Sequence, residues 1–383
     1  MTYTHCSLQL LKKKGVALKK TNYTTIRNMS KHKFNYEWTL EDSKFTKDKG
    51  TVFSCFACGG GSTMGYKLAG FDVIGMNEID PKMADCYIEN HKPKHSYIED
   101  IRTFKNRTDL PKELYNLDIL DGSPPCSSFS TAGNRDKDWG KEKKFKEGQA
   151  VQVLDTLFFD FIDLAKKLQP KVVIAENVKG IVLGKAKHYA KKILSSLDDA
   201  GYITQEFILD ASSMGVPQRR ERVFFIAVRK DLVEYLPKNP SLLFSDFPIL
   251  NLVFFEKKIP FGMVQIEDEE REELSDNLKG RWDEADKMGR YDKRSEGGIK
   301  FGFFYKLMKW RVAATLMSGG CYSIEDSAHH INKEELCKVG SYPLDYKFLN
   351  NPPQYLIGMS VPPIMTAQVA SRIYECWLSK LVT

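Results

Sequence analysis

The sequence predicts an open α/β sheet of parallel strands with helices on both faces, together with a small irregular domain. Short runs that are apolar on both faces alternate with segments of helical periodicity between residues 51 and 228. This alternation stops near residue 230. Residues 231–310 are mixed, with an acidic stretch from Glu267 to Glu273 and a glycine-rich one from Gly297 to Gly302. The loss of the pattern indicates a second, smaller domain.

The predicted elements of the sheet follow one another along the chain. Thr51 to Phe56 reads as a buried strand, followed by a glycine turn and a helix through Leu68. Further strands are predicted at residues 72–76, 118–120, 172–175 and 223–228. One apolar helix face is predicted from Val151, Leu154, Phe158, Phe161, Ala165 and Leu168. A final helix from Met365 to Leu381 is expected to return to the sheet.

The bulk composition is that of a globular protein. The chain has 383 residues, of which 42% are hydrophobic and 28% charged. No apolar run approaches the ~20 residues that span a bilayer, and Lys12, Lys13 and Lys14 interrupt the first apolar stretch. We therefore expect a cytoplasmic protein without a membrane partner.

The net charge of +7 is concentrated near the N-terminus. Residues 1–36 hold eight Lys/Arg and no Asp or Glu, whereas the rest of the chain carries 49 basic and 50 acidic residues. The overall charge is therefore poor evidence for a nucleic-acid partner, and a DNA-binding surface must come from local clustering. We expect residues 1–49 to form a flexible basic arm.

The eight cysteines are scattered, and Cys55 and Cys58 form the only close pair. Disulfides are rare in cytosolic proteins. A zinc site would need a second Cys/His pair at short spacing, and the sequence shows none, so we predict no metal site. A redox role for the pair stays open, although the glycines after Cys58 explain the turn better.

A glycine-rich turn and an acidic residue form the first candidate site. Phe56-Ala-Cys-Gly-Gly-Gly61 follows the first strand, and Glu78 follows the second. In α/β sheets, ligands bind at the carboxyl ends of strands near such a turn, and a carboxylate there can accept two hydrogen bonds from a ribose. The spacing is not the G-x-G-x-x-G of dinucleotide-binding proteins. A tight turn without a ligand stays the alternative.

A cysteine in a rigid turn is the second candidate. Cys126 directly follows Pro124 and Pro125 in Asp121-Gly-Ser-Pro-Pro-Cys126. The prolines restrict the backbone, and attack on an electron-poor ring carbon needs a thiolate at a fixed position. Free cysteines are commonly buried in cores, but the flanking prolines and serines do not suit a core strand. We therefore predict a nucleophile.

Two polar segments complete the set of candidates. Glu176 follows the strand at 172–175, where a carboxyl group could hand a proton to a ring nitrogen. In Gln218-Arg-Arg-Glu-Arg222, strand alternation puts Arg220 and Arg222 on one face, where they could hold a carbonyl oxygen or a phosphate. A solvated loop glutamate and a charged strand lead-in are the alternatives.

Taken in this order, the four segments resemble the C5-cytosine DNA methyltransferase family, from residue 51 to about residue 380. Glu99-Asp100-Ile101 matches the family's adenine-binding step. Arg311-Val-Ala-Ala-Thr315-Leu is similar to the block after the recognition domain, and Gly358-Met-Ser-Val-Pro-Pro363 to the closing cofactor block. The departures from the family's usual residues are Cys58, Gly59, Val312 and Met359.

The resemblance implies a Rossmann-like class I methyltransferase sheet that uses S-adenosylmethionine, releases S-adenosylhomocysteine and acts on double-stranded DNA. It implies that Cys126 attacks C6 of a flipped-out cytosine while Glu176 supports protonation at N3. Arg222 would position the base and support Glu176, and Arg220 would contact the base, the sugar-phosphate or a loop. The implied cofactor residues are Phe56, Gly60, Gly61, Glu78, Ile79, Asp100, Ile101, Pro125, Ser360 and Val361.

The resemblance also divides the chain. The expected parts are a basic N-terminal arm (1–49), a catalytic and cofactor-binding domain (50–240), a target-recognition domain (241–316), a hinge (317–357) and a C-terminal helix returning to the catalytic domain (358–383). Ser127 to Gly148 resembles the mobile loop that closes on DNA. Candidate phosphate contacts are Arg290, Arg294, Lys300, Lys306 and Lys309. We expect a nucleoid-associated monomer of a restriction-modification system.

Three other functions were weighed against this one. A tRNA cytosine C5-methyltransferase of the same fold typically carries Cys-Phe-Thr near the recognition region, and this tripeptide does not occur in the sequence. A catalytically silent DNA-binding regulator would be suggested by a lost nucleophile or glutamate, and both are present. A dinucleotide oxidoreductase does not fit, because the glycine spacing is wrong and Pro-Pro-Cys would be unexplained.

Overall fold

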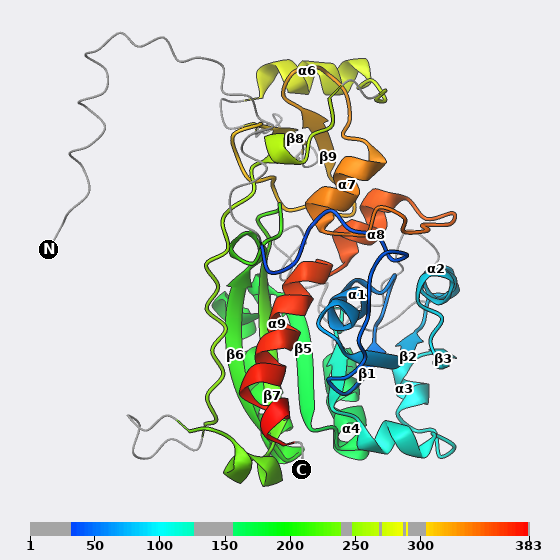
Figure 1. Ribbon diagram of the computed structural model, residues 1–383, viewed down its shortest axis with the longest axis vertical. Helices are drawn as coiled ribbons and strands as arrows, with labels where there is room; N and C mark the ends of the chain where they lie inside the picture. The colour runs from blue at the N-terminus through cyan, green and yellow to red at the C-terminus, as the bar shows by residue number, and fades with distance from the viewer. Residues whose placement is uncertain are drawn as a thin grey trace, which may run out of the picture.

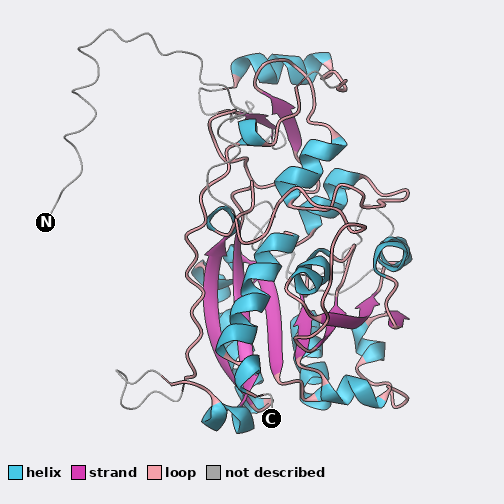
Figure 2. Ribbon diagram, viewed as in Figure 1, coloured by secondary structure: helices cyan, strands magenta, loops and turns pink. Residues whose placement is uncertain are grey.

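The computed structural model describes residues 32–125, 156–238, 247–267, 270–285, 289 and 304–381. A large sheet with helices packed on it lies below a smaller unit that contains α6, β8, β9 and α7 (Figure 1). Figure 2 shows the strands of the large sheet running side by side behind α9. Within the described part of the chain, no helix is long and apolar enough to cross a bilayer.

Seven strands form the main sheet in the described part of the chain, in the order β3-β2-β1-β4-β5-β7-β6. The chain runs from β1 outward to β3 and then continues with β4 on the other side of β1. The strand order therefore reverses between β1 and β4, and in open α/β sheets ligands bind at such a point. The strands are β1 (Thr51–Cys55), β2 (Asp72–Glu78), β3 (His95–Ile98), β4 (Ile119–Gly122), β5 (Val172–Val178), β6 (Tyr202–Asp210) and β7 (Glu221–Arg229).

The predicted parallel sheet is confirmed for β1 to β5 and wrong for β7. β7 runs antiparallel to both β5 and β6. The link between β6 and β7, residues 211–220, is shorter than the dozen or so residues that a parallel crossover needs, so the chain turns straight back. Strands β3 and β6 were not predicted, because their exposed positions interrupt the apolar runs that mark the buried strands.

Helices cover both faces of the sheet, as predicted. α1 (Gly61–Leu68) and α9 (Pro363–Cys376) pack side by side on one face (Figure 1). α3 (Ile101–Phe104), α4 (Leu157–Leu168) and α5 (Lys187–Asp199) supply the core of the other face. The remaining helices are α2 (Pro81–His91), α6 (Asp276–Glu284), α7 (Lys333–Gly340) and α8 (Pro353–Met359).

Two predicted helices differ in extent from those in the structure. The predicted apolar face is confirmed in α4 from Phe158 to Leu168, whereas Val151 and Leu154 lie outside the described residues. The C-terminal helix α9 ends at Cys376, and a short 3-10 turn, Leu378–Lys380, replaces its predicted last turn.

The core consists of two layers separated by the sheet. Along β4, Ile119 packs with the α1 and α9 layer and Leu120 with the α4 layer. Side chains alternate along a strand, so Asp121 points to the same face as α1. The same alternation along β5 directs Glu176 to that face. Two carboxylates therefore point to the α1 side of the sheet.

The segment 32–49 packs on the body of the protein, so the predicted flexible arm is wrong for these residues. The indole of Trp38 donates to the backbone carbonyl of Ser341 at 3.0 Å. The backbone N–H groups of Leu40 and Glu41 donate to the carboxylate of Asp345 at 2.7 and 3.0 Å. Residues 1–31 lie outside the described part of the chain.

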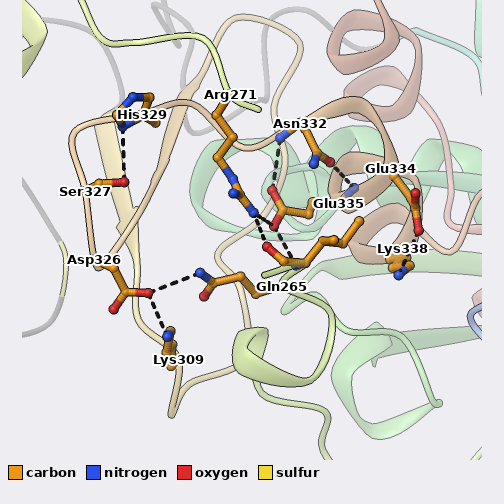
Figure 3. Close-up of polar contacts among 11 residues, drawn as sticks. Gln265, Arg271, Lys309, Asp326, Ser327, His329, Asn332, Glu334, Glu335 and Lys338 are labelled. Carbon is orange, nitrogen blue, oxygen red and sulfur yellow. Dashed lines mark hydrogen bonds and ion pairs between the residues drawn. The ribbon is translucent and has the colours of Figure 1, made fainter. Parts of the chain in front are cut away.

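The smaller unit is organised around a parallel pair of strands, β8 (Phe304–Leu307) and β9 (Cys321–Ile324). Glu335 of α7 is fully buried and pairs with Arg271 at 2.6 Å (Figure 3). Its carboxylate also accepts the N–H groups of Ile266 and Asn332 at 2.9 and 3.0 Å. This network ties the chain around residue 271 to α7. The small sheet spans the predicted boundary at 316, and the division into domains stays a prediction.

Candidate active site at the carboxyl edge of the sheet

The turn after β1 contains three residues with left-handed backbone angles, and one of them must be glycine. Phe56 and Cys58 have left-handed φ angles of 52° and 47°, and Gly60 has 81°. A Cβ at Gly60 would lie 2.3 Å from Nε2 of His91, so only glycine fits there. The N–H of Cys58 donates to Oε2 of Glu78 at 2.8 Å. The predicted glycine turn therefore lies directly against the end of β2.

Glu78 is buried at the end of β2, and backbone groups hold its carboxylate. Oε2 accepts the N–H of Cys58, and Oε1 accepts those of Ile79 and Asp80, both at 2.9 Å. Burial raises the pKa of Glu78, and these N–H donors oppose that rise. A carboxylate has about four acceptor positions, so roughly one is left for a ribose hydroxyl.

Asp100 lies at the start of α3, next along the sheet edge. It accepts the backbone N–H of Arg102 at 2.8 Å and the guanidinium of Arg102 at 2.6 Å. Burial raises the pKa of Asp100, but the bonds from Arg102 outweigh that effect and leave the pKa lowered. Ile101 is buried in the core below. Asp100 is therefore a carboxylate whose orientation Arg102 fixes.

The segment before α9 closes over the glycine turn. A Cβ at Gly61 would lie 2.7 Å from the carbonyl oxygen of Val361 and 2.7 Å from Cβ of Ser360, so the two backbones are in direct contact. The hydroxyl of Ser360 lies 2.5 Å from that of Tyr342. Met359, which precedes this contact, is 43% exposed. Residues about 300 positions apart in sequence thus meet at one turn.

The proline turn after β4 is held from the neighbouring strand. The amide of Asn177, which follows Glu176 in β5, donates to the carbonyl of Pro124 at 3.0 Å. Pro125 is partly exposed at the edge. Cys126, the predicted nucleophile, lies outside the described residues, as does the predicted closing loop from Ser127 to Gly148.

Glu176 and Arg222 form a buried ion pair beside this turn. Nε of Arg222 lies 2.9 Å from Oε1 of Glu176, and the two side chains are 14% and 10% exposed. Arg222 stands opposite Val178 because β7 runs antiparallel to β5. The first residues of β7 therefore reach the edge where β5 ends. The sequence analysis placed these residues together, although it predicted the wrong strand direction.

Arg220 connects loops, and among the described residues it has no carboxylate partner. Its side chain, 2% exposed, donates to the carbonyl of Leu316 at 2.7 Å and to that of Gly358 at 2.8 Å. Gln218 supports the same loop by accepting the N–H of Leu316 at 2.9 Å. The contact of Arg220 with the base, the sugar-phosphate or a loop beside the DNA stays a prediction. Arg220 connects β7 to the segments on either side of α7.

The two described candidates for phosphate binding already have partners. Nζ of Lys306 lies 3.7 Å from the centre of the Trp282 ring, and Nζ of Lys309 lies 2.7 Å from Asp326 (Figure 3). The other candidates, Arg290, Arg294 and Lys300, lie outside the described residues.

A small cavity joins the sheet edge to the smaller unit. Its volume is about 40 Å³, and its lining includes the basic residues Arg219, Lys306 and Arg311. The N–H of Arg219 donates to the carbonyl of Ala313 at 3.0 Å, and the hydroxyl of Thr315 donates to the carbonyl of Arg219 at 2.5 Å. Positive charge therefore gathers locally where the two parts of the molecule meet.

One buried acid at this edge, Asp121 of β4, is not among the residues that the sequence predicts. Its carboxylate accepts hydrogen bonds from the hydroxyls of Ser54, Ser62 and Tyr66. Burial raises the pKa of Asp121 to about 6, and the nearby Glu176 adds to this. The available signal was an aspartate in the strand that leads to Pro-Pro-Cys, where apolar residues would suit a central strand.

Comparison with known proteins identifies relatives among enzymes that modify DNA. The chain is 35% identical over 181 residues to the Type II methyltransferase M.FnuDI of Fusobacterium nucleatum, which covers 47% of each protein. It is 26% identical over 359 residues to the Type II methyltransferase M.PspPI of Psychrobacter sp. (strain TA137), which covers 89% of this chain and 82% of the relative. The matches to M.FnuDI and M.NgoPII span about half the length of those relatives.

Solved structures show the same fold. A putative DNA modification methyltransferase from an E. coli prophage has a TM-score of 0.59 and 20% identity, with 85% of this chain and 99% of that chain covered. The S. pombe Dnmt2 methyltransferase has a TM-score of 0.57 and 15% identity over 87% and 99%. The family model described as C-5 cytosine-specific DNA methylase matches residues 50–375, from β1 through nearly all of α9. The chain therefore belongs to the C-5 cytosine-specific DNA methylase family.

Proposed function

We propose that this protein transfers a methyl group from S-adenosylmethionine to C5 of cytosine in a short sequence of double-stranded DNA. The observation that carries the proposal is the Glu176–Arg222 ion pair beside the turn of Pro124 and Pro125. A carboxylate, a guanidinium and a proline turn that leads to a cysteine supply the groups that addition to a pyrimidine ring requires.

The proposed chemistry begins with the thiolate of Cys126, which adds to C6 of a cytosine flipped out of the duplex. Glu176 supplies a proton at N3, so that the ring electrons reach C5. Arg222 fixes the orientation of the Glu176 carboxylate and positions the base. After C5 takes the methyl group, the C5 proton leaves to a base or water, the Cys126 thiolate departs with its electron pair, and the N3 proton returns to Glu176.

The carboxyl edge of the sheet fits the methyl donor. Gly61 contacts Ser360 and Val361 directly, and a side chain at position 61 would collide with both. Glu78 and Asp100 lie further along the same edge. When bound, S-adenosylmethionine supplies an electrophilic methyl group. The residues proposed to hold it are Phe56, Gly60, Gly61, Glu78, Ile79, Asp100, Ile101, Pro125, Ser360 and Val361.

Residues 241–316 are proposed to read the DNA sequence from the major groove. The cavity beside the sheet edge is lined by Arg219, Lys306 and Arg311. These basic side chains favour binding of DNA phosphates there. The relatives named above are Type II methyltransferases, and we propose that this chain belongs to a restriction-modification system.

The test is transfer of labelled methyl groups from S-adenosylmethionine to unmethylated duplex DNA, with tRNA in a parallel reaction. We expect 5-methylcytosine at one recurring short motif in base-resolution maps of the DNA. Label in the tRNA alone would replace the DNA proposal with a tRNA methyltransferase. Label in neither substrate, with DNA still bound, would favour a silent DNA-binding regulator.

The covalent step has its own test in Cys126→Ser. This variant is expected to lose transfer and keep DNA binding in gel-shift measurements. DNA with fluorine at C5 of the target cytosine is expected to trap an adduct on Cys126 of the parent protein. Full activity of Cys126→Ser, or methylation without an adduct, would contradict the covalent mechanism.

A further inference from the structure

A buried carboxylate that the proposed chemistry does not use lies at the centre of the sheet. Asp121 of β4 is 3% exposed. Its Oδ2 accepts hydrogen bonds from Ser54 at 2.9 Å and Ser62 at 2.8 Å, and its Oδ1 accepts one from Tyr66 at 2.9 Å. The carboxylate therefore joins β4 to β1 and to α1, the helix that follows the glycine turn.

Two other carboxylates in the chain are held differently. Asp118, just before β4, pairs with Lys171 at 2.8 Å. Glu335 is fully buried and pairs with Arg271 at 2.6 Å. Among the described residues, Asp121 has no lysine or arginine partner, and its three donors are neutral hydroxyls. Its negative charge is therefore not compensated within the described protein.

In the part of the chain that the structure describes, the groups that face Asp121 bring no positive charge. An ionised carboxylate in a buried place without a counter-charge costs folding free energy. Burial raises the pKa of Asp121 to about 6, with a further contribution from Glu176 and opposition from the three hydroxyls. A cation that enters this edge would be attracted by Asp121. The titratable groups that face it are Cys55 of β1, Tyr66 of α1, Tyr87 of α2 and Glu176 of β5.

The position of Asp121 places this charge behind the proposed cofactor turn. Asp121 is in register with Ser54, at the point where the strand order reverses between β1 and β4. Ser62 directly follows Gly61, whose backbone contacts Val361. The strand continues from Asp121 into the proline turn. One carboxylate thus connects the glycine turn with the strand that carries the proposed nucleophile.

We propose that Asp121 is a specificity-determining residue that favours the positively charged methyl donor over the neutral reaction product. This inference rests on the proposed function. S-adenosylmethionine carries a sulfonium, an ammonium and a carboxylate, and therefore one net positive charge. S-adenosylhomocysteine has lost the sulfonium charge and is neutral overall. A fixed negative charge at this edge stabilises the first ligand more than the second, and so favours release of the product after transfer.

The test is calorimetric binding of S-adenosylmethionine and S-adenosylhomocysteine at pH 8, without DNA, to the parent, Asp121→Asn and Asp118→Asn. Asp121→Asn keeps the shape of the side chain and removes its charge. The preference is the ratio of the dissociation constants of the two ligands. We expect it to fall roughly tenfold in Asp121→Asn, because the variant loses one unit charge in a partly buried site. Asp118→Asn is the matched control, because Asp118 belongs to the same strand pair and also binds a β1 hydroxyl. Its preference is expected to equal that of the parent.

The dependence of the preference on pH separates charge from shape. In the parent, the preference is expected to decline between pH 8 and pH 5 as Asp121 takes up a proton, whereas Asp121→Asn stays constant. Tyr66→Phe removes one hydroxyl donor from the carboxylate, so its decline is expected at a higher pH than in the parent. Thermal melts establish that each variant is folded.

Three outcomes would overturn the proposal. Equal weakening of both ligands by Asp121→Asn would mean that Asp121 acts only through shape. Unchanged affinities for both ligands in Asp121→Asn would mean that its charge does not reach the ligand. In both cases the proposed function stands, because the parent still binds both ligands. Absence of binding to the parent would remove the inference and the proposed cofactor together.

Discussion

The two edges of the main sheet hold their carboxylates in different ways. At the amino edge, each of three carboxylates has a cation: the partly exposed Asp118 pairs with Lys171, and the exposed Asp198 and Asp231 pair with Lys230 and Arg229. At the carboxyl edge, Glu78 and Asp121 are buried and held by backbone N–H groups or hydroxyls, whereas Glu176 and Asp100 each pair with an arginine.

The two edges therefore differ in how their carboxylates contribute to the free energy of folding. Exposed ion pairs contribute little, and their loss is tolerated. Buried acids without a counter-charge oppose folding, so their retention at one edge indicates a function. Mutations that act on the two edges therefore test whether the contrast is real.

The largest effect is expected for Glu176→Gln at the carboxyl edge. The amide keeps a contact with Arg222 but cannot supply a proton at N3, so methyl transfer should fall by about 10²- to 10⁴-fold. Initial rates of labelled transfer to DNA at saturating cofactor measure this. Glu221→Gln is the control, because Glu221 carries an exposed ion pair with Lys179 in the same region. Wild-type rates in Glu176→Gln would remove the proton-transfer role.

The second largest effect is expected for Arg220→Met, and it concerns stability. The substitution leaves the carbonyls of Leu316 and Gly358 without their donors, which should cost on the order of 2–4 kcal/mol. Urea unfolding at constant pH measures the change, with the exposed Arg219→Met as the matched control. Unfolding free energies that agree between the two variants would show that Arg220 does not fasten these loops.

The third prediction uses the raised pKa of Asp121. Because its folded-state pKa is about 6 against an ordinary value of 3.8, ionisation opposes folding, and this penalty grows between these two pH values and is complete above them. Asp121→Asn should therefore be more stable than the parent at pH 8 by roughly 1–3 kcal/mol, and equal to it near pH 4. Thermal unfolding across this range measures the difference. A variant less stable than the parent at pH 8 would show that the hydroxyl bonds outweigh the cost of the buried charge.

Local sequence was sufficient to predict much of the carboxyl edge. Glu78 and Pro125 were assigned to it because each follows an apolar strand, and the carboxyl ends of parallel strands share one edge. The direction of β7 was not predictable in the same way, because an apolar run such as 223–228 does not encode its partner. Only the short link at 211–220 carried that information.

Roles that depend on long-range contacts were also out of reach. For Arg220 the sequence leaves the base, the sugar-phosphate and a loop as alternatives, and its partners in the structure, the carbonyls of Leu316 and Gly358, lie about 96 and 138 residues away in sequence. Asp121 was overlooked because a hydroxyl cluster assembled from β1, α1 and β4 has no local pattern. The roles of both charged residues depend on their burial, which cannot be read from a single sequence.

The smallest effect is expected at the amino edge, for Asp118→Asn. Asp118 bonds the N–H of Thr51 at 2.7 Å, a contact that the amide oxygen of asparagine can replace, and only the pair with Lys171 is lost. Partly exposed ion pairs contribute about 0–1 kcal/mol, so the unfolding free energy should fall by less than about 1 kcal/mol at low salt and change less at high salt. Urea unfolding at two salt concentrations measures both numbers. A loss as large as that of Arg220→Met would abolish the contrast between the edges, because it would make a replaceable pair as costly as a buried one.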